Sequence, residues 1–290
     1  MPSIEGRTTC SDGIELLTRH WPADEVEAGG AWAGSPWATV LLVHGLAEHS
    51  GRYEHVGDQL AASGLDVYAF DQRGNGGSEG PRGHVDRWSQ LHDDLAQRLA
   101  AARESSAGRP VALYGHSVGG LIVAGYCLSP RPKPDLAVLS APALDSTLPA
   151  WKKSLARALA RVTPGIDIPS AIDGDTLSRD PSVATRKAGD PLCVTTGTAR
   201  FGVEALREQA RVREAAVDGL GIPTLILHGL DDALVPHEAS QVFDSAPGVE
   251  RRTLPGLRHE LHNEPEGPEV VDEIVVWLRE QVMQRGRLTA

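Results

Sequence analysis

The stretch Gly115-His116-Ser117-Val118-Gly119 decides how this chain is interpreted. It follows the apolar run at residues 111–114 and precedes a second apolar segment, residues 120–124, so the serine lies between a predicted strand and a predicted helix. In so sharp a turn, the side chains two residues on either side of the serine would collide unless both positions were glycine. The pattern therefore predicts a nucleophile elbow, with the hydroxyl of Ser117 exposed at the tip of a strand.

The elbow requires two partners. A serine hydroxyl is a poor nucleophile near neutral pH, so Ser117 needs a histidine that takes its proton and a carboxylate that orients this histidine. In this architecture the three groups follow one another along the chain as serine, acid and histidine. Asp231 and Asp232 come directly after a predicted buried strand at residues 222–228. An acid is therefore present at the end of a strand, where the chemistry requires it.

Four histidines compete for the role of the base: His116, His237, His259 and His262. His116 is too close along the chain to turn onto the hydroxyl of its neighbour, and His237 falls where a surface helix is predicted to begin. We choose His259, because it lies nearer than His262 to the end of the predicted strand at residues 250–254. Either acid could reach its imidazole, and the other is expected to be a turn residue that accepts backbone hydrogen bonds.

The oxyanion of the reaction requires backbone N–H donors. The amide of Val118, directly after the serine, is the first expected donor. The second should come from the turn after the predicted strand at residues 38–43, where His44-Gly45 lets the backbone point an amide inward. That makes Leu46 the expected donor. The alternative interpretation of His44-Gly45 is an ordinary turn that ends a strand.

The composition agrees with a globular enzyme. The chain has 290 residues, of which 41% are hydrophobic and 23% charged, and this excludes a disordered protein. A net charge of −11 argues against a nucleic-acid partner, because the phosphates would be repelled. Three widely spaced cysteines, Cys10, Cys127 and Cys193, form neither a disulfide framework nor a metal motif. We therefore expect a cytoplasmic protein.

No targeting segment, cofactor or metal is expected. Residues 1–7 lack the charged and apolar regions of a signal peptide, and no run of eighteen apolar residues could span a membrane. His228 with Asp231 and Asp232 resembles a set of metal ligands, but no further ligand is spaced to join them. Residues 71–76 contain closely spaced glycines without the order of a dinucleotide-binding loop.

Strands and helices alternate along the chain in the way that builds an α/β fold, a mostly parallel sheet with helices on both faces. The expected strands are residues 13–21, 38–43, 65–70, 111–114, 136–140, 224–228 and 250–254. The expected helices are residues 53–63, 88–105, 119–128, 238–245 and 268–284. Residues 27–35, rich in glycine and alanine, are expected to form a surface loop.

The alternation stops between about residues 143 and 219, where helical segments and proline turns appear without a convincing strand. We expect a helical cap over the active site here, with residues 1–142 and 220–290 as the core. Within it, residues 151–162 form an amphipathic basic helix, with its apolar and basic side chains at helical spacing. This helix is either a lid that touches a lipid interface or a helix whose apolar face packs on the core. We favour packing, because one face of most helices is apolar.

Four segments carry a family resemblance: residues 44–53, 71–80, 82–85 and 115–120. They resemble the monoacylglycerol lipase and lysophospholipase branch of the α/β-hydrolases, and the resemblance extends over residues 37–142 and 220–282 and more loosely between them. It implies an α/β-hydrolase fold, with Ser117 as nucleophile, Asp232 as acid and His259 as base. Asp232 is preferred to Asp231 because the acid of the family lies three residues after a glycine and four before a proline, here Gly229 and Pro236.

The chain departs from the family pattern at a few positions. Ala47 stands where the family usually has glycine, Val118 where it has methionine, and Gln72 and Asn75 where it has histidines. Val118 acts through its amide, so that change leaves the chemistry intact. Ala47 could narrow or re-aim the oxyanion turn, because alanine tolerates fewer backbone conformations than glycine.

The resemblance also implies a polar network of Glu48, Arg52 and His262 behind the catalytic histidine. The alternative is a set of unrelated surface charges.

The residues predict hydrolysis of a carboxylic ester through an acyl-enzyme. The resemblance implies a monoacylglycerol substrate, a small lipid ester cleaved to glycerol and a fatty acid, with transient membrane contact through the cap as a further expectation. Lysophospholipase or general carboxylesterase activity would use the same residues. A ligand-binding receptor built on an inactive hydrolase fold is the alternative from another class, and the oligomeric state is not predicted.

Overall fold

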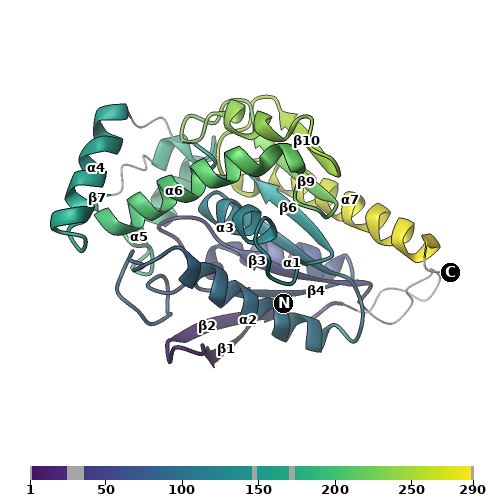
Figure 1. Cartoon of the computed structure of the whole chain (residues 1–290). Helices are drawn as coiled ribbons and strands as arrows, with labels where there is room; N and C mark the ends of the chain where they lie inside the picture. Colours follow the sequence, from purple (N-terminus) through teal and green to yellow (C-terminus); the bar gives the residue numbers. More distant parts are fainter. Residues whose placement is uncertain (1, 25–35, 146–148, 170–173, 289–290) are drawn as a thin grey trace.

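The computed structural model describes residues 2–24, 36–145, 149–169 and 174–288. The strands of the central sheet are β1 (Ile4–Thr9), β2 (Glu15–Trp21), β3 (Ala38–Val43), β4 (Leu65–Phe70), β5 (Val111–His116), β6 (Leu136–Ser140), β9 (Thr224–Gly229) and β10 (Val249–Leu254). They are ordered β1-β2-β4-β3-β5-β6-β9-β10 in one eight-stranded sheet (Figure 1). Only β2 runs against the other strands of this sheet, because it pairs antiparallel with both of its neighbours.

Helices cover both faces of the sheet. They are α1 (Glu54–Ala62), α2 (Ser89–Ser105), α3 (Val118–Cys127), α4 (Ala150–Val162), α5 (Pro181–Gly189), α6 (Ala199–Ala215) and α7 (Gly267–Leu288), with short 3-10 helices η1 (Ser50–Tyr53), η2 (Gly174–Thr176), η3 (Ala216–Asp218), η4 (His237–Phe243) and η5 (Leu261–Asn263). The central strands are buried along their whole length, because helices cover them on both sides, and they read as continuous apolar runs. The fold is therefore the α/β sheet that the alternation predicts.

Alternate residues of one strand belong to two different hydrophobic cores. In β3, Leu41 and Val43 pack in the core that contains α2 and α3. Val40 and Leu42 pack in the other core, with α1 and α7. Successive side chains of a strand point to opposite faces, so one short segment anchors both helical layers.

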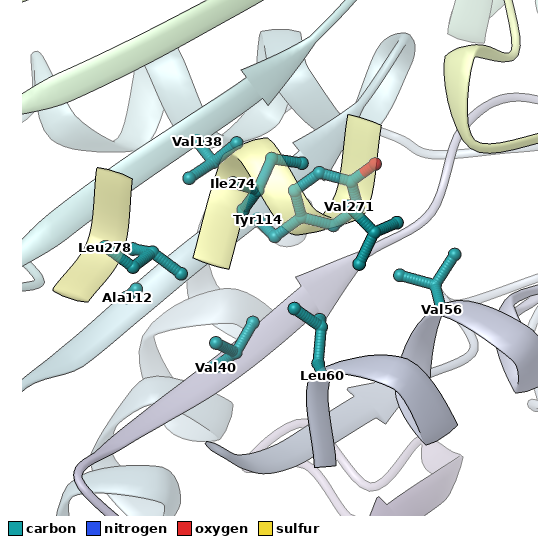
Figure 2. A pocket seen from close by; sticks show the side chains of 9 residues that line it. All are labelled: Val40, Val56, Leu60, Ala112, Tyr114, Val138, Val271, Ile274 and Leu278. Carbon is teal, nitrogen blue, oxygen red and sulfur yellow. The ribbon is translucent and has the colours of Figure 1, made fainter. Parts of the chain in front are cut away.

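A small cavity remains in the second core, between the sheet and the helices α1 and α7 (Figure 2). Its lining residues are Val40, Val56, Leu60, Ala112, Tyr114, Val138, Val271, Ile274 and Leu278. Eight of these nine side chains are aliphatic, and such cavities stay dry. It is a packing gap in the core and offers no group that could perform chemistry on a substrate.

The structure corrects the sequence analysis in three places in the fold. Strand β1 is missing from the expected elements, because it is an edge strand whose side chains are mostly exposed and lack an apolar pattern. The helix expected at residues 238–245 is a 3-10 helix, η4. Between residues 143 and 219, two short strands, β7 (Asp167–Pro169) and β8 (Thr196–Thr198), form a small antiparallel sheet. The loop expected at residues 27–35 lies outside the described residues.

The segment at residues 143–219, called the inserted segment below, connects two neighbouring strands of the sheet, β6 and β9. Its helix α4 packs on α6 through small side chains, Ala160 against Ala199 and Val203. Leu159 also packs partly against this cluster, but three other apolar side chains of α4 do not. Trp151 is 64% exposed, Leu155 50% and Val162 81%. The interpretation that the apolar face of this helix packs on the core is therefore wrong for these three residues.

Candidate active site

Ser117 lies in the turn between β5 and α3 with a φ of +53°, in the backbone region that side chains disfavour. The two glycines make this turn possible, as predicted. A Cβ on Gly119 would lie 2.1 Å from the carbonyl oxygen of Val43, and one on Gly115 would lie 2.6 Å from the carbonyl oxygen of Gly119. The strained position is held in place by tight backbone packing, which is typical of functional turns.

Three distant side chains meet at this turn. The Ser117 hydroxyl lies 2.9 Å from His259 Nε2, and His259 Nδ1 lies 2.7 Å from Asp232 Oδ2. With the imidazole proton on Nδ1, the hydroxyl donates to Nε2 and Nδ1–H donates to the carboxylate. All three side chains are buried, so the predicted exposure of Ser117 is wrong, because His259 and the turn after β3 pack against it. This arrangement can accept a proton from the serine during attack on a substrate.

Asp232 combines two roles that the sequence analysis assigned to separate acids. Its Oδ1 accepts hydrogen bonds from the amides of Leu234 and Val235, each at 2.9 Å, while Oδ2 faces His259. Asp231 is exposed and is not the acceptor for this turn. Burial raises the pKa of Asp232, but His259, His228 and the turn amides outweigh it and hold the pKa well below 3.8. The acid is therefore ionised and fixed in direction.

The remaining candidate histidines do not reach the serine. His237 lies at the start of η4, partly exposed, as expected. The ring of His116 packs 4.9 Å from that of His259, and burial lowers the pKa of His116 to about 4, with a further contribution from His259. His262 is stacked 4.6 Å from Tyr53, and neither of its ring nitrogens has a hydrogen-bond partner among the described residues. His262 thus packs behind the site as a neutral ring.

A buried ion cluster connects the oxyanion turn to the loop of His259. Arg52 contacts Glu48 at 2.5 Å and Glu260 at 2.9 and 2.7 Å. Glu48 also accepts hydrogen bonds from the amide of Gly45 and from the hydroxyl of Tyr53. Burial raises the pKa of Glu260, but Arg52 outweighs it and lowers the pKa to about 2. The network is real for Glu48 and Arg52, while His262 takes no hydrogen bond in it.

Sequence reasoning missed Glu260 and Tyr53 in this cluster. The only available signal was adjacency, because Glu260 follows His259 and Tyr53 follows Arg52. Adjacency says nothing about the direction of a side chain, so the pairing of Arg52 with Glu260 across 208 residues emerges only from the fold.

The expected oxyanion donors belong to two segments that adjoin the serine, the start of α3 and the turn after β3. Val118 is the first residue of α3, so its amide has no partner within the helix. The turn that contains Leu46 packs against the serine, because a Cβ on Gly45 would lie 3.1 Å from Ser117 Cβ. Gln72, one of the departures from the family pattern, fixes this turn by donating its side-chain amide to the carbonyl of His44 at 2.5 Å.

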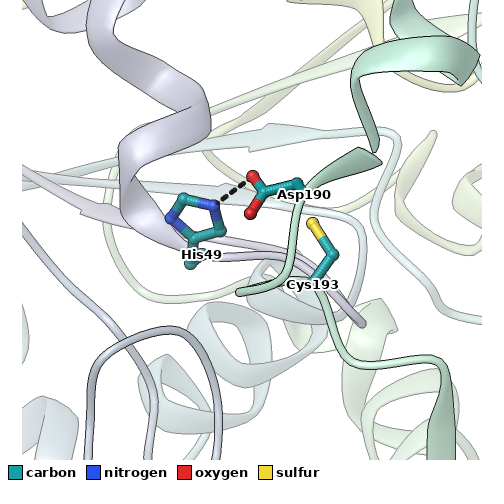
Figure 3. Close-up of side chains that lie close together, drawn as sticks. All are labelled: His49, Asp190 and Cys193. Atoms are coloured by element: carbon teal, nitrogen blue, oxygen red, sulfur yellow. Dashed lines mark hydrogen bonds and ion pairs between the residues drawn. The ribbon is translucent and has the colours of Figure 1, made fainter. Parts of the chain in front are cut away.

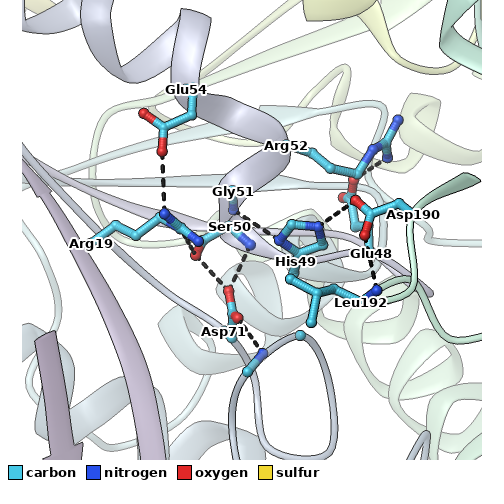
Figure 4. Close-up of polar contacts among 12 residues, drawn as sticks. Arg19, Glu48, His49, Ser50, Gly51, Arg52, Glu54, Asp71, Asp190 and Leu192 are labelled. Carbon is cyan, nitrogen blue, oxygen red and sulfur yellow. Dashed lines mark hydrogen bonds and ion pairs between the residues drawn. The ribbon is translucent and has the colours of Figure 1, made fainter. Parts of the chain in front are cut away.

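The far end of the oxyanion turn is anchored by Asp71 (Figure 4). One of its carboxylate oxygens accepts hydrogen bonds from the amide and the hydroxyl of Ser50, at 2.8 and 2.5 Å. The other accepts the amide of Gly77 at 2.8 Å. Because Arg19 also donates to the hydroxyl of Ser50, the turn is held from the sheet side by a buried polar cluster.

A serine, an imidazole and a carboxylate placed at the carboxyl edge of a mostly parallel sheet define a serine hydrolase with the α/β-hydrolase fold. The sequence model described as "Serine aminopeptidase, S33" matches residues 34–266. The chain belongs to this family, in its monoacylglycerol lipase branch. The resemblance stated from the sequence is thereby confirmed.

Several relatives are similar to this chain over nearly their whole length. The chain is 35% identical to a monoacylglycerol lipase of Mycolicibacterium smegmatis, covering 92% of this chain and 93% of that protein. It is 31% identical to the monoglyceride lipase of Homo sapiens, covering 95% and 90%. Among solved structures, the monoacylglycerol lipase of Paleococcus ferrophilus has a TM-score of 0.80 at 31% identity, covering 92% of this chain and 99% of that one.

Replacing Arg52 tests the ion cluster. In Arg52→Ala, two buried carboxylates lose their cation, and we expect a loss of about 3–5 kcal/mol of unfolding free energy at neutral pH. The wild-type carboxylates have lowered pKa values, so their contribution is present above the unfolded pKa and is lost as pH falls toward the folded value. In the variant, both carboxylates take up protons more readily, so its deficit should shrink as pH falls from about 7 to about 4.

Urea denaturation across this pH range measures the effect. Arg252→Ala is the matched control, because Arg252 pairs with Glu250 and Glu273 at the surface, where such pairs contribute less than about 1 kcal/mol. We also expect kcat of Arg52→Ala to fall more than substrate affinity. A deficit that is independent of pH, or an unchanged kcat, would contradict the role given to the cluster.

Replacing Ala47 tests the strain in the oxyanion turn. Ala47 is buried and has a φ of +59°, a conformation that costs a residue with a Cβ about 1 kcal/mol. The turn therefore already follows the path that glycine takes, so Ala47→Gly should raise the unfolding free energy by about 0.5–1 kcal/mol and leave kcat unchanged. Ala101→Gly, at an exposed position in α2, should destabilise by about 1 kcal/mol. If both variants changed the unfolding free energy in the same direction, the strain at Ala47 would be disproved.

Proposed function

We propose that this enzyme hydrolyses monoacylglycerols to glycerol and a fatty acid through an acyl-enzyme formed on Ser117. The observation that carries the proposal is the continuous path from the serine hydroxyl through His259 to Asp232, at 2.9 and 2.7 Å. The substrate class is supported by the relatives, which are named monoacylglycerol or monoglyceride lipases and match this chain over nine-tenths of its length.

The geometry supports a two-step reaction. The hydroxyl oxygen of Ser117 attacks the ester carbonyl while Nε2 of His259 takes the hydroxyl proton. The carbonyl oxygen becomes an oxyanion, which the amides of Leu46 and Val118 stabilise. The imidazolium then donates its proton to the departing glycerol oxygen. In the second step, His259 activates a water that attacks the acyl-enzyme, and the fatty acid leaves as Ser117 regains its proton.

Access to the serine runs past the inserted segment, which we assign as a cap. Ser117 is only 8% exposed. Residues of the inserted segment bond directly to both catalytic loops, since the amide of Ala143 donates to the carbonyl of Ser117 and the amide of Glu260 donates to the carbonyl of Leu177. Movement of the segment would therefore displace the backbone next to His259 as well as the backbone at Ser117.

Two measurements test the proposed function. Ser117→Ala should lower kcat on a chromogenic ester by about 10⁴-fold or more, whereas Ser245→Ala, at an exposed position, should leave it unchanged. Release of glycerol and fatty acid from monoacyl, diacyl and triacyl glycerols and from lysophospholipids then identifies the substrate. Monoacylglycerols should be cleaved fastest. Diacyl and triacyl species cleaved as fast as monoacyl ones would refute the proposed preference for monoacylglycerols, and a loss below about tenfold in Ser117→Ala would favour a binding protein.

The enzyme meets its substrate at a lipid interface through α4. Among the described residues, no helix combines the length and apolarity that crossing a bilayer requires. The helix α4 instead exposes Trp151, Leu155 and Val162, with Arg157 and Arg161 exposed on the same helix. Exposed aromatic and aliphatic side chains beside basic ones are typical of helices that lie in a membrane surface.

Substitution of the exposed apolar side chains tests this contact. We expect the double variant Trp151→Ser/Leu155→Ser to bind less to phosphatidylcholine vesicles that contain monoacylglycerol, and to hydrolyse that monoacylglycerol more slowly. Its kcat/KM on a water-soluble ester should stay unchanged, because α4 contributes no proposed catalytic group. Val276→Ser is the control, because Val276 is similarly exposed but belongs to α7, outside the inserted segment. Unchanged vesicle binding by the double variant would contradict the proposed contact between α4 and the lipid interface.

A further inference from the structure

A second cluster of reactive side chains lies outside the proposed catalytic residues. His49, Asp190 and Cys193 place an imidazole nitrogen, a carboxylate oxygen and a sulfur within 4.8 Å of one another (Figure 3). His49 belongs to the oxyanion turn of the core, whereas Asp190 and Cys193 belong to the inserted segment just after α5. We propose that these three side chains bind a divalent transition-metal ion, Zn²⁺ by preference, and that the ion clamps the inserted segment to the oxyanion turn.

The two ligands from the inserted segment are presented by one ordered turn. The amide of Cys193 donates to the carbonyl of Asp190 at 3.2 Å, and the amide of Leu192 donates to Asp190 Oδ1 at 2.9 Å. Asp190 Oδ2 is thereby left to face His49 Nε2 at 2.8 Å. Because Asp190 and Cys193 are three residues apart in this turn, both side chains lie on the same side of the chain.

The ligand set matches the chemistry of zinc. Imidazole nitrogen, thiolate sulfur and carboxylate oxygen are its usual protein ligands, and three of them leave a fourth position for water. On binding, the thiol of Cys193 releases its proton to solvent. The proton between His49 and Asp190 moves to His49 Nδ1, and the amide of Gly51 gives up the bond it makes there at 3.2 Å. The ion takes the place between the imidazole and the carboxylate.

The surrounding charges also favour a cation. Arg52 is bonded to Glu48 and Glu260, and Lys187 lies 4.0 Å from Glu260, so these two cations and two anions balance one another. Among the described residues, the ion-pair partner of Asp190 in the core is His49, which is neutral when its Nδ1 accepts the Gly51 amide. One carboxylate and one thiolate then equal the charge of a divalent ion.

Cobalt and zinc binding tests the site without reference to activity. Metal-free wild-type protein should bind one equivalent of Co²⁺ with a thiolate-to-cobalt charge-transfer band, and should take Zn²⁺ from a chromophoric chelator. Cys193→Ser should lose the band, although Cys10 and Cys127 remain. His49→Gln and Asp190→Asn should bind Zn²⁺ at least about tenfold more weakly. Asp167→Asn and His237→Gln, at an exposed and a partly exposed position, are the matched controls and should bind as the wild type does.

Either of two results overturns the site: a charge-transfer band that survives in Cys193→Ser, or wild-type protein that is folded by circular dichroism yet shows neither the band nor zinc uptake.

The clamping role of the ion rests on the proposed function and is tested by separate measurements of stability and activity. Zn²⁺ should raise the thermal midpoint and lower kcat/KM on a soluble ester in the wild type, and do neither in Cys193→Ser. Binding without either effect refutes the clamp alone, and an inactive wild type would refute the proposed function while leaving the binding result intact.

Discussion

The backbone conformation of Ser117 is the constraint on which the rest of the structure depends. A residue with a Cβ at a φ of +53° is unfavourable by itself, and it persists because Gly115 and Gly119 on either side pack against α3 and the end of β3 without room for a Cβ. The central sheet, covered by helices on both faces, supplies that rigidity. The strain is stored at the one position where a hydroxyl must be held away from its own chain and toward an imidazole.

Electrostatic balance is the second requirement of the site. Glu48, Glu260, Arg52 and Asp232 are all buried or nearly so, and an isolated charge in such surroundings would be neutralised or would unfold the protein. Each therefore has a charged or hydrogen-bonding partner: Glu48 finds Arg52 four residues along the chain, whereas Glu260 and Asp232 find Arg52 and His259 in distant parts of it. The neutral rings of His116 and His262 fill the space between these charges and add no charge of their own, because burial lowers the pKa of both.

Features encoded by local pattern could be predicted from the sequence, whereas features decided by tertiary packing could not. The parallel strands are apolar runs bounded by turns, and the elbow needs glycine at two fixed positions, so both were visible in residues 111–124. Strand β1 was missed because an edge strand needs no buried side chains. The ion pair of Arg52 with Glu260, the unpaired ring of His262 and the exposed face of α4 depend on the direction in which each side chain points. Periodicity carries no such information.

The two ends of the inserted segment leave from β6 and return to β9, which are adjacent strands of the sheet. The chain thus departs from and rejoins the scaffold at almost the same place, so the entropy of closing the detour varies only slowly with its length. An architecture of this kind lets the inserted segment be lengthened, shortened or replaced while the hydrogen-bonded strands of the sheet keep their register. The length and sequence of this segment can then change separately from the scaffold that holds Ser117.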